Sequence, residues 1–300
     1  MRLEEIIDNY QKEKNVIDSL STLYLSEEDI DVCNYVTSQL HDIDIGNINY
    51  GQEISFFDLI WYGSDQMVIF NDDLINERIL NLLRTTEFKM GVNNEQQFGT
   101  GIYYDIDKLG KVDRNSGRIS RFSLPHALNE LSVYCFGHEQ VHALKETNYM
   151  EYIYAKSLGE VIPILFEFMI YNPEEVLKKE LIKFRMDNLM NNKLEYECMN
   201  KLYKQSWRVA VGSGEAEIYK RACLYEYVRS KIGCYLNSFY YALILYHMYR
   251  ENPDKILGLT ASVLNHKMTT MEMLVELGIY GDIRGELFEK ELGNIRKLVR

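Results

Sequence analysis

The chain has 300 residues, of which 46% are hydrophobic and 26% are charged, and its formal net charge is −12 at pH 7. This composition is ordinary for a soluble globular protein with a large core. The acidic balance argues against a nucleic-acid partner, because phosphate contacts favour a basic surface.

Neither a secretory signal nor a membrane span is predicted. Residues 1–7 lack the apolar segment of a signal peptide. The longest apolar run, 239–246, is far shorter than the roughly 20 residues that cross a membrane. The five cysteines are scattered and lack the close spacing of a zinc knuckle or a redox pair. We therefore expect a cytoplasmic protein with reduced thiols and no membrane partner.

Apolar residues recur at helical spacing along most of the chain. Ser26, followed by three acidic residues, predicts the capped start of a helix that runs toward Leu40. Pro173 predicts a helix start, and residues 212–214 (Gly-Ser-Gly) predict a break. In chain order, helical pattern covers about 3–20, 26–40, 71–83, 126–146, 152–171, the stretch from 173 to that break, 215–232, 236–250, 253–264, 269–277 and 284–299.

The pattern changes after Gly91, where β-type segments appear. Segments 101–106 and 118–124 flank a stretch rich in turn residues, 113–117, and predict a β-hairpin. The fold class expected is therefore mainly α, with a small β-hairpin or sheet just before the helix over 126–146. We expect an N-terminal helical region, 1–90, and a second region, 91–300, in one compact unit.

The helix over 126–146 contains the pattern His-Glu-x-x-His, formed by His138, Glu139 and His142. Residues i and i+4 lie on one face of a helix, so both imidazoles can bind one metal ion. The glutamate beside the first histidine can act on a water molecule that the metal activates. This spacing predicts a Zn²⁺ site and zinc-assisted hydrolysis of a peptide bond.

A catalytic zinc site has three protein ligands, so a third residue is needed. Glu146 lies on the same helix and Glu151 lies in the connection that follows, but we expect Glu160, eighteen residues after His142, as the third ligand. That interval allows a second helix to return to the metal. Glu167 lies two turns after Glu160 on the same face. It is either an acceptor for an imidazole N–H or the ligand itself.

His138-Glu139-x-x-His142-Ala143-Leu144, followed by Glu160, Pro163 and Glu167, resembles the gluzincin metallopeptidases. Within them it is most similar to the thimet oligopeptidase and oligoendopeptidase F family. The resemblance implies a multi-helix, zincin-like peptidase body, with 91–300 as the metallopeptidase catalytic region. It also implies that the hairpin edge pairs with the backbone of a peptide substrate.

Residues 235–242 (Tyr-Leu-Asn-Ser-Phe-Tyr-Tyr-Ala) resemble the tyrosine-rich segment of the oligoendopeptidases, where tyrosines stabilise the oxyanion. By this resemblance Tyr240 is a catalytic residue, with Tyr235 or Tyr241 beside it. The same spacing also fits an aromatic stripe in a helical core. Both interpretations stay open at the level of sequence.

The function expected is that of a zinc-dependent peptidase that hydrolyses short peptides, with Glu139 as the proton-transferring residue. Within the zinc hydrolases, an aminopeptidase of another gluzincin branch is the alternative. Outside the enzymes, the alternative is a catalytically degenerate zincin fold that binds peptides or regulates a partner. The sequence leaves the cleavage preference and the oligomeric state open.

Overall fold

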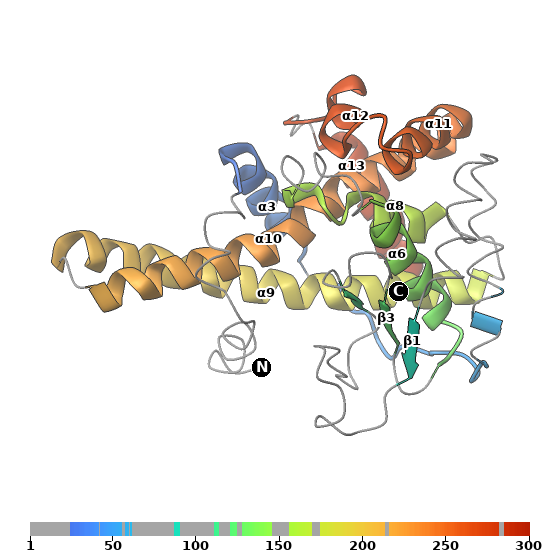
Figure 1. Ribbon diagram of the computed structural model, residues 1–300, viewed down its shortest axis with the longest axis horizontal. Helices are drawn as coiled ribbons and strands as arrows, with labels where there is room; N and C mark the ends of the chain where they lie inside the picture. The colour runs from blue at the N-terminus through green and yellow to red at the C-terminus, as the bar shows by residue number, and fades with distance from the viewer. Residues whose placement is uncertain are drawn as a thin grey trace.

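The computed structural model describes residues 25–41, 43–55, 58–59, 61, 87–90, 111–113, 121–124, 128–145, 156–169, 175–213, 216–281 and 285–300. The described part is mainly helical, as the sequence predicts (Figure 1). Its elements are α3 (Glu27–Gln39), β1 (Glu87–Met90), β2 (Lys111–Asp113), β3 (Arg121–Leu124), α6 (Ser132–Lys145), the 3₁₀ turn η3 (Lys156–Leu158), α8 (Val161–Met169), α9 (Glu175–Ser213), α10 (Ala216–Glu251), α11 (Pro253–Leu264), α12 (Thr270–Glu276) and α13 (Glu286–Val299).

Helix α10 is the centre of the molecule. It runs beside α9 along much of its length, and it also contacts α3, α8, α11 and α13 (Figure 1). Its segment from Leu236 to Leu245 is buried on every face, which explains why that segment lacks charged residues. The sequence predicted two helices here, 215–232 and 236–250. That break is wrong, because Gly233 continues the helix at the point where α3 packs against it.

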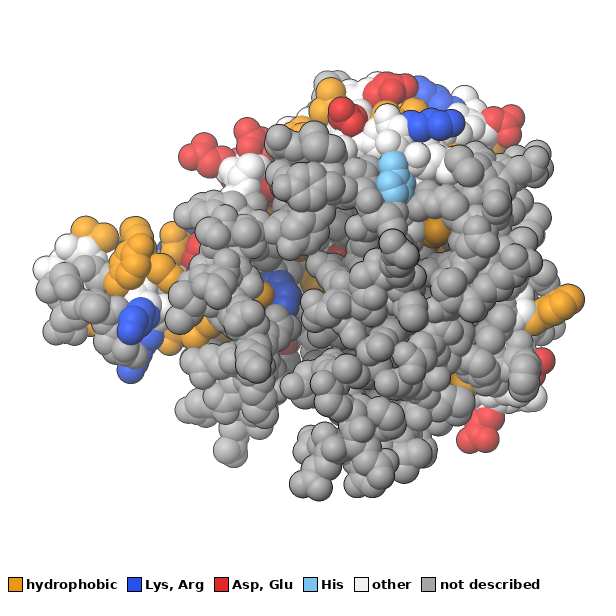
Figure 2. Space-filling view, viewed as in Figure 1, with side chains coloured by type: hydrophobic (Ala, Val, Ile, Leu, Met, Phe, Trp, Pro, Cys, Tyr) orange, Lys and Arg blue, Asp and Glu red, His pale blue; other side chains and the backbone are white. Residues whose placement is uncertain are grey.

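The C-terminal part of α9 and the N-terminal part of α10 extend beyond the other described elements as a two-helix arm (Figure 1). We take this arm as residues 200–213 of α9 and 216–229 of α10. The rings of Tyr203, Trp207 and Tyr219 stack along this arm, with centroids 6.2 Å and 5.8 Å apart. Val211 near its tip is 74% exposed, and Figure 2 shows apolar side chains gathered at this end of the molecule.

Helix α3 begins where the sequence predicts. The Ser26 hydroxyl accepts a hydrogen bond from the backbone N–H of Asp29, and the Asp29 carboxylate accepts one from the backbone N–H of Ser26. This reciprocal cap satisfies two backbone donors at the helix start. The same device, with Thr269 and Glu272, begins α12.

Three short strands form a sheet in the order β1-β3-β2, with β1 parallel and β2 antiparallel to β3. Strand β3 lies inside the predicted strand 118–124, but both of its edges are occupied by β1 and β2. The predicted pairing of 118–124 with 101–106 is therefore wrong for residues 121–124. Residues 101–106 themselves lie outside the described residues.

The helix that carries the histidine pattern, α6, begins at Ser132 rather than near residue 126. The Asn129 side chain accepts a hydrogen bond from the backbone N–H of Ser132 and caps the first turn. At the other end of α6, the His266 imidazole lies 3.0 Å from the carbonyl oxygen of Leu144 and donates to it. Both ends of the helix thus have side-chain partners, which hold α6 in place.

No helix among the described residues combines the length and the apolar character that crossing a membrane requires. All five cysteines are free thiols, as predicted.

Candidate metal centre

His138 and His142 lie one turn apart on the same face of α6, as their spacing predicts. Their ring centroids are 4.8 Å apart, and their Nε2 atoms are 3.1 Å apart. Most of α6 around them is buried, including Phe136 and Val141. The helix therefore presents both imidazoles to the protein interior, where a polar group needs a partner.

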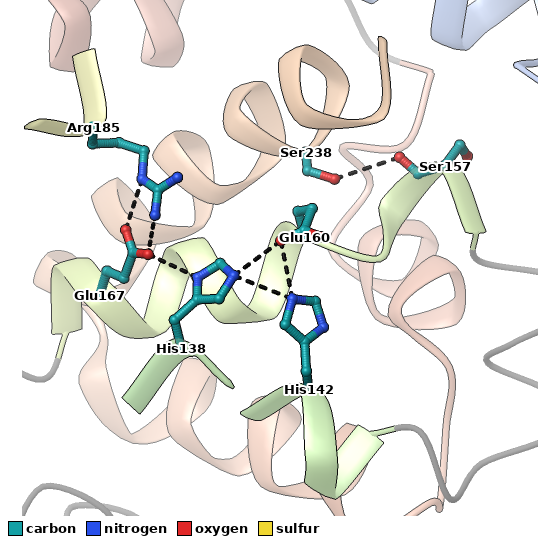
Figure 3. Close-up of polar contacts among 7 residues, drawn as sticks. All are labelled: His138, His142, Ser157, Glu160, Glu167, Arg185 and Ser238. Carbon is teal, nitrogen blue, oxygen red and sulfur yellow. Dashed lines mark hydrogen bonds and ion pairs between the residues drawn. The ribbon is translucent and has the colours of Figure 1, made fainter. Parts of the chain in front are cut away.

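Glu160 completes the group from a different part of the chain. After α6 the chain returns through η3, and Glu160 immediately precedes α8, where its carbonyl accepts the N–H of Ile164. Its Oε2 atom lies 3.1 Å from Nε2 of His138 and 3.1 Å from Nε2 of His142 (Figure 3). We refer to His138, His142 and Glu160 as the three-residue cluster.

The turn that carries Glu160 is anchored to α10 and α3. The Ser157 carbonyl accepts a hydrogen bond from Asn237 Nδ2 at 3.2 Å. It accepts a second one from Ser238 Oγ at 3.4 Å (Figure 3). Asn237 Nδ2 also donates to Asp29 Oδ1 at 2.9 Å, in a fully buried contact. The cap of α3 and the turn before α8 are thus joined through one amide group.

The donor set and its geometry fit a zinc ion. Two imidazole nitrogens and one carboxylate oxygen are common ligands of catalytic zinc, with a fourth position left for water or substrate. Ligand atoms around a tetrahedral zinc stand roughly 3.3–3.4 Å apart, because each lies about 2.0–2.1 Å from the ion. The three atoms here lie 3.1 Å from one another. They form the one such group of three ligand atoms found in the part of the chain that the structure describes.

Glu167 lies on the other side of the His138 ring, inside α8. Its Oε1 atom is 2.7 Å from Nδ1 of His138, at ion-pair distance, while Nε2 of the ring faces the cluster (Figure 3). The carboxylate is 2% exposed and is the only charged group of α8. The sequence did not decide which of the two glutamates is the third ligand. Glu160 lies close to both Nε2 atoms, whereas Glu167 contacts Nδ1 of His138.

Arg185 of α9 pairs with Glu167. Its Nε atom donates to Oε2 at 2.8 Å, and Nη2 donates to Oε1. No pattern in the sequence singles out Arg185. The signal for it was indirect: a carboxylate within the otherwise apolar run 161–169 needs a buried cation, but spacing along the chain cannot say which one.

The charges of the cluster are strongly coupled. Burial lowers the pKa of the His138 imidazole, but Glu167 and Glu160 outweigh burial and raise that pKa to about 10. Burial raises the pKa of Glu160, yet the two histidines hold it well below its usual range. Without a metal, the same contacts therefore suit a protonated His138 that pairs with two carboxylates. A metal ion would take the place of the proton on Nε2.

Glu139 lies on α6 beside His138 and is 8% exposed. It is not one of the three converging groups, which agrees with a role other than that of a ligand. Glu146 and Glu151, the other carboxylates near the motif, lie outside the described residues.

Tyr240 has the surroundings of a core residue. Its side chain has no exposed surface, and its ring packs against Tyr35, Tyr241 and Phe288 at centroid distances of 6.0, 5.2 and 5.1 Å. This packing matches the aromatic core stripe that the sequence left open. Tyr235, one of the two tyrosines predicted to act with Tyr240, is 36% exposed. The catalytic role of Tyr240 stays a prediction.

No protein-family model matches the chain, and searches of curated proteins and of solved structures find no match to it. The resemblance to the gluzincin peptidases therefore rests on the motif residues themselves.

Proposed function

We propose that this protein is a zinc-dependent peptidase that hydrolyses short peptides, as the sequence motif predicts. The observation that carries the proposal is the convergence of the three-residue cluster, in which residues from α6 and from the turn before α8 bring three ligand atoms within 3.1 Å of one another. Glu139, next to His138 in the sequence, would provide a carboxylate for proton transfer.

His138, His142 and Glu160 would hold the zinc ion. A bound zinc supplies a Lewis acid that polarises a carbonyl group and makes water a better nucleophile at neutral pH. Glu139 would take a proton on its carboxylate from the attacking water and later pass it to the leaving amine. Glu167 would keep His138 turned so that Nε2 faces the ion.

The proposal includes a zincin-like arrangement around the motif helix. Strands β2 and β3 contact α6, so a small sheet lies beside the helix that carries both histidines. An exposed sheet edge there would offer backbone groups to an extended peptide. Tyr240 has no exposed surface, so it would act as the oxyanion donor only after a movement of α10 that exposes its hydroxyl.

The test combines metal content with hydrolysis. Purified protein should contain about one zinc per chain, measured by plasma mass spectrometry, and should cleave peptides in a mixed short-peptide library, measured by mass spectrometry. Glu139→Gln should keep the zinc and lose at least about 10²-fold in rate, because it removes the proton acceptor. Glu197→Gln, an exposed substitution on α9, is the matched control and should change neither quantity.

The outcomes separate the alternatives. Protein without stoichiometric zinc overturns the proposal. Zinc without hydrolysis in the unmodified protein supports the catalytically degenerate alternative. Cleavage confined to peptides with a free N-terminus, against blocked versions of the same peptides, identifies an aminopeptidase rather than an endopeptidase.

A further inference from the structure

Arg185 and Glu167 form a buried pair directly behind the cluster. The side chains of Glu167 and Arg185 are 2% and 14% exposed. Burial of the guanidinium on α9 carries a desolvation cost, which two hydrogen bonds to one carboxylate offset. The pair joins α9 to α8 at the point where α8 faces His138 (Figure 3).

The two Glu167 oxygens are used differently. Oε2 accepts from Arg185 Nε at 2.8 Å. Oε1 accepts from Arg185 Nη2 and also lies 2.7 Å from His138 Nδ1. Since the guanidinium fork fixes the plane of the carboxylate, it also fixes where Oε1 lies against Nδ1 of the imidazole. The orientation of the His138 ring then follows, and with it the direction of Nε2.

We propose that Arg185 is a positioning residue for the metal centre, acting through Glu167 on His138. This inference rests on the proposed zinc site and deepens it, because it names the group that orients a ligand without touching the ion. A lysine at this position would keep the charge but would lose the two-point hydrogen bond, so it would let the carboxylate rotate. Outer hydrogen-bond partners of this kind typically change metal affinity by about 10–100-fold.

Arg229 provides a matched comparison within the same protein. It is 5% exposed on α10, pairs with Glu226 at 2.7 Å and lies over the ring of Tyr203 at 4.6 Å. Its partners lie on the α9–α10 arm and are not members of the cluster or of the pair behind it. Arg229→Lys therefore removes the fork of a buried arginine without disturbing the proposed relay.

The experiment measures zinc affinity of the metal-free full chain by competition with a chromophoric chelator, at one pH and ionic strength. Arg185→Lys should bind zinc about 10–100-fold more weakly than the unmodified chain, whereas Arg229→Lys should bind it equally well. Loaded with Co²⁺, Arg185→Lys should also show an altered visible absorption spectrum, because one ligand is reoriented. Melting of the metal-free proteins, followed by circular dichroism, reports folding independently of the metal.

Each outcome decides a separate point. If the unmodified chain binds no zinc, the proposed function and this inference both fail. If the unmodified chain binds zinc and the folded Arg185→Lys variant has the same affinity and Co²⁺ spectrum, only this inference is overturned. If Arg185→Lys does not fold, Arg185→Gln replaces it, since a shorter neutral donor removes the fork as well. Equal weakening by Arg229→Lys would also overturn the inference, because the effect would then be general destabilisation.

Discussion

At the scale of single residues, His138 has a carboxylate close to each of its two ring nitrogens. Nδ1 faces Glu167 and Nε2 faces Glu160. An imidazole held from both sides has one orientation, which favours metal binding since no rotamer freedom is lost at that step. The raised pKa of His138, about 10 without a metal, has the same origin in the two carboxylates outweighing burial.

The thiols give a prediction at the same scale. Burial raises the pKa of Cys33, Cys135 and Cys234, which keeps these thiols protonated and unreactive. Cys198 and Cys223 are only half-buried. Alkylation of the native protein, mapped by peptide mass spectrometry, should modify Cys198 and Cys223 first and the three buried thiols only after unfolding.

Labelling in denaturant serves as the control and should make all five thiols equally reactive. If Cys135 reacted in the native protein as fast as Cys198, the burial of α6 around the histidines would be wrong.

At the scale of elements, the crossing of α3 over α10 depends on a glycine. A Cβ atom at Gly233 would lie 2.6 Å from Leu25 Cδ1, 3.2 Å from Tyr196 Cε2 and 3.4 Å from Cys33 Sγ. The Gly233 carbonyl also accepts a hydrogen bond from Cys33 Sγ at 3.2 Å. The absence of a Cβ at Gly233 leaves room for Leu25 and Cys33, and α10 continues through the break that the sequence predicts between 232 and 236.

Gly233→Ala should therefore destabilise the protein by about 1–3 kcal/mol, because the added methyl group overpacks a buried contact. Gly293→Ala in α13 is the matched control, since a Cβ atom there meets nothing within 4 Å. That substitution should stabilise by about 0.5–1 kcal/mol, as alanine replaces glycine inside a helix. Urea unfolding curves of the two variants measure both effects, and stabilisation by both would rule out close packing of α3 on α10.

At the scale of the whole molecule, the cluster joins α6 to the turn before α8. His138 and His142 belong to α6, and Glu160 precedes α8. A metal that binds only the folded chain stabilises it by mass action, by about 2.7 kcal/mol when the free metal is 100 times its Kd.

Zinc added to the metal-free protein should therefore raise the melting temperature, and a chelator should reverse the rise. His142→Ala removes one ligand and should abolish this dependence. Mg²⁺ serves as a control ion and should have little effect, because it prefers oxygen ligands. A melting temperature that is independent of zinc in the unmodified protein would contradict the site, as would zinc dependence that survives in His142→Ala.

Periodicity in the sequence predicted the mainly helical fold, the capped start of α3 and the shared face of His138 and His142. These features depend on residues within a few positions of one another, so local spacing decides them. It also predicted that a glutamate after His142 returns to the histidines, but it left Glu160 and Glu167 as alternatives. Which one lies with both Nε2 atoms depends on how the turn at 157–160 sits against α10, and Asn237 holds that turn from far along the chain.

The features that the sequence did not determine all depend on contacts between distant segments. Strand β3 pairs with β1 and β2 rather than with 101–106, since register depends on which edges meet in space. Gly233 lies inside α10, where the missing Cβ leaves room for Leu25. Arg185 lies behind the cluster because α9 passes there. A pattern such as His-Glu-x-x-His specifies a chemistry through one helical turn. Only the tertiary structure decided which groups complete it, because burial creates the need for a partner and packing selects which residue meets it.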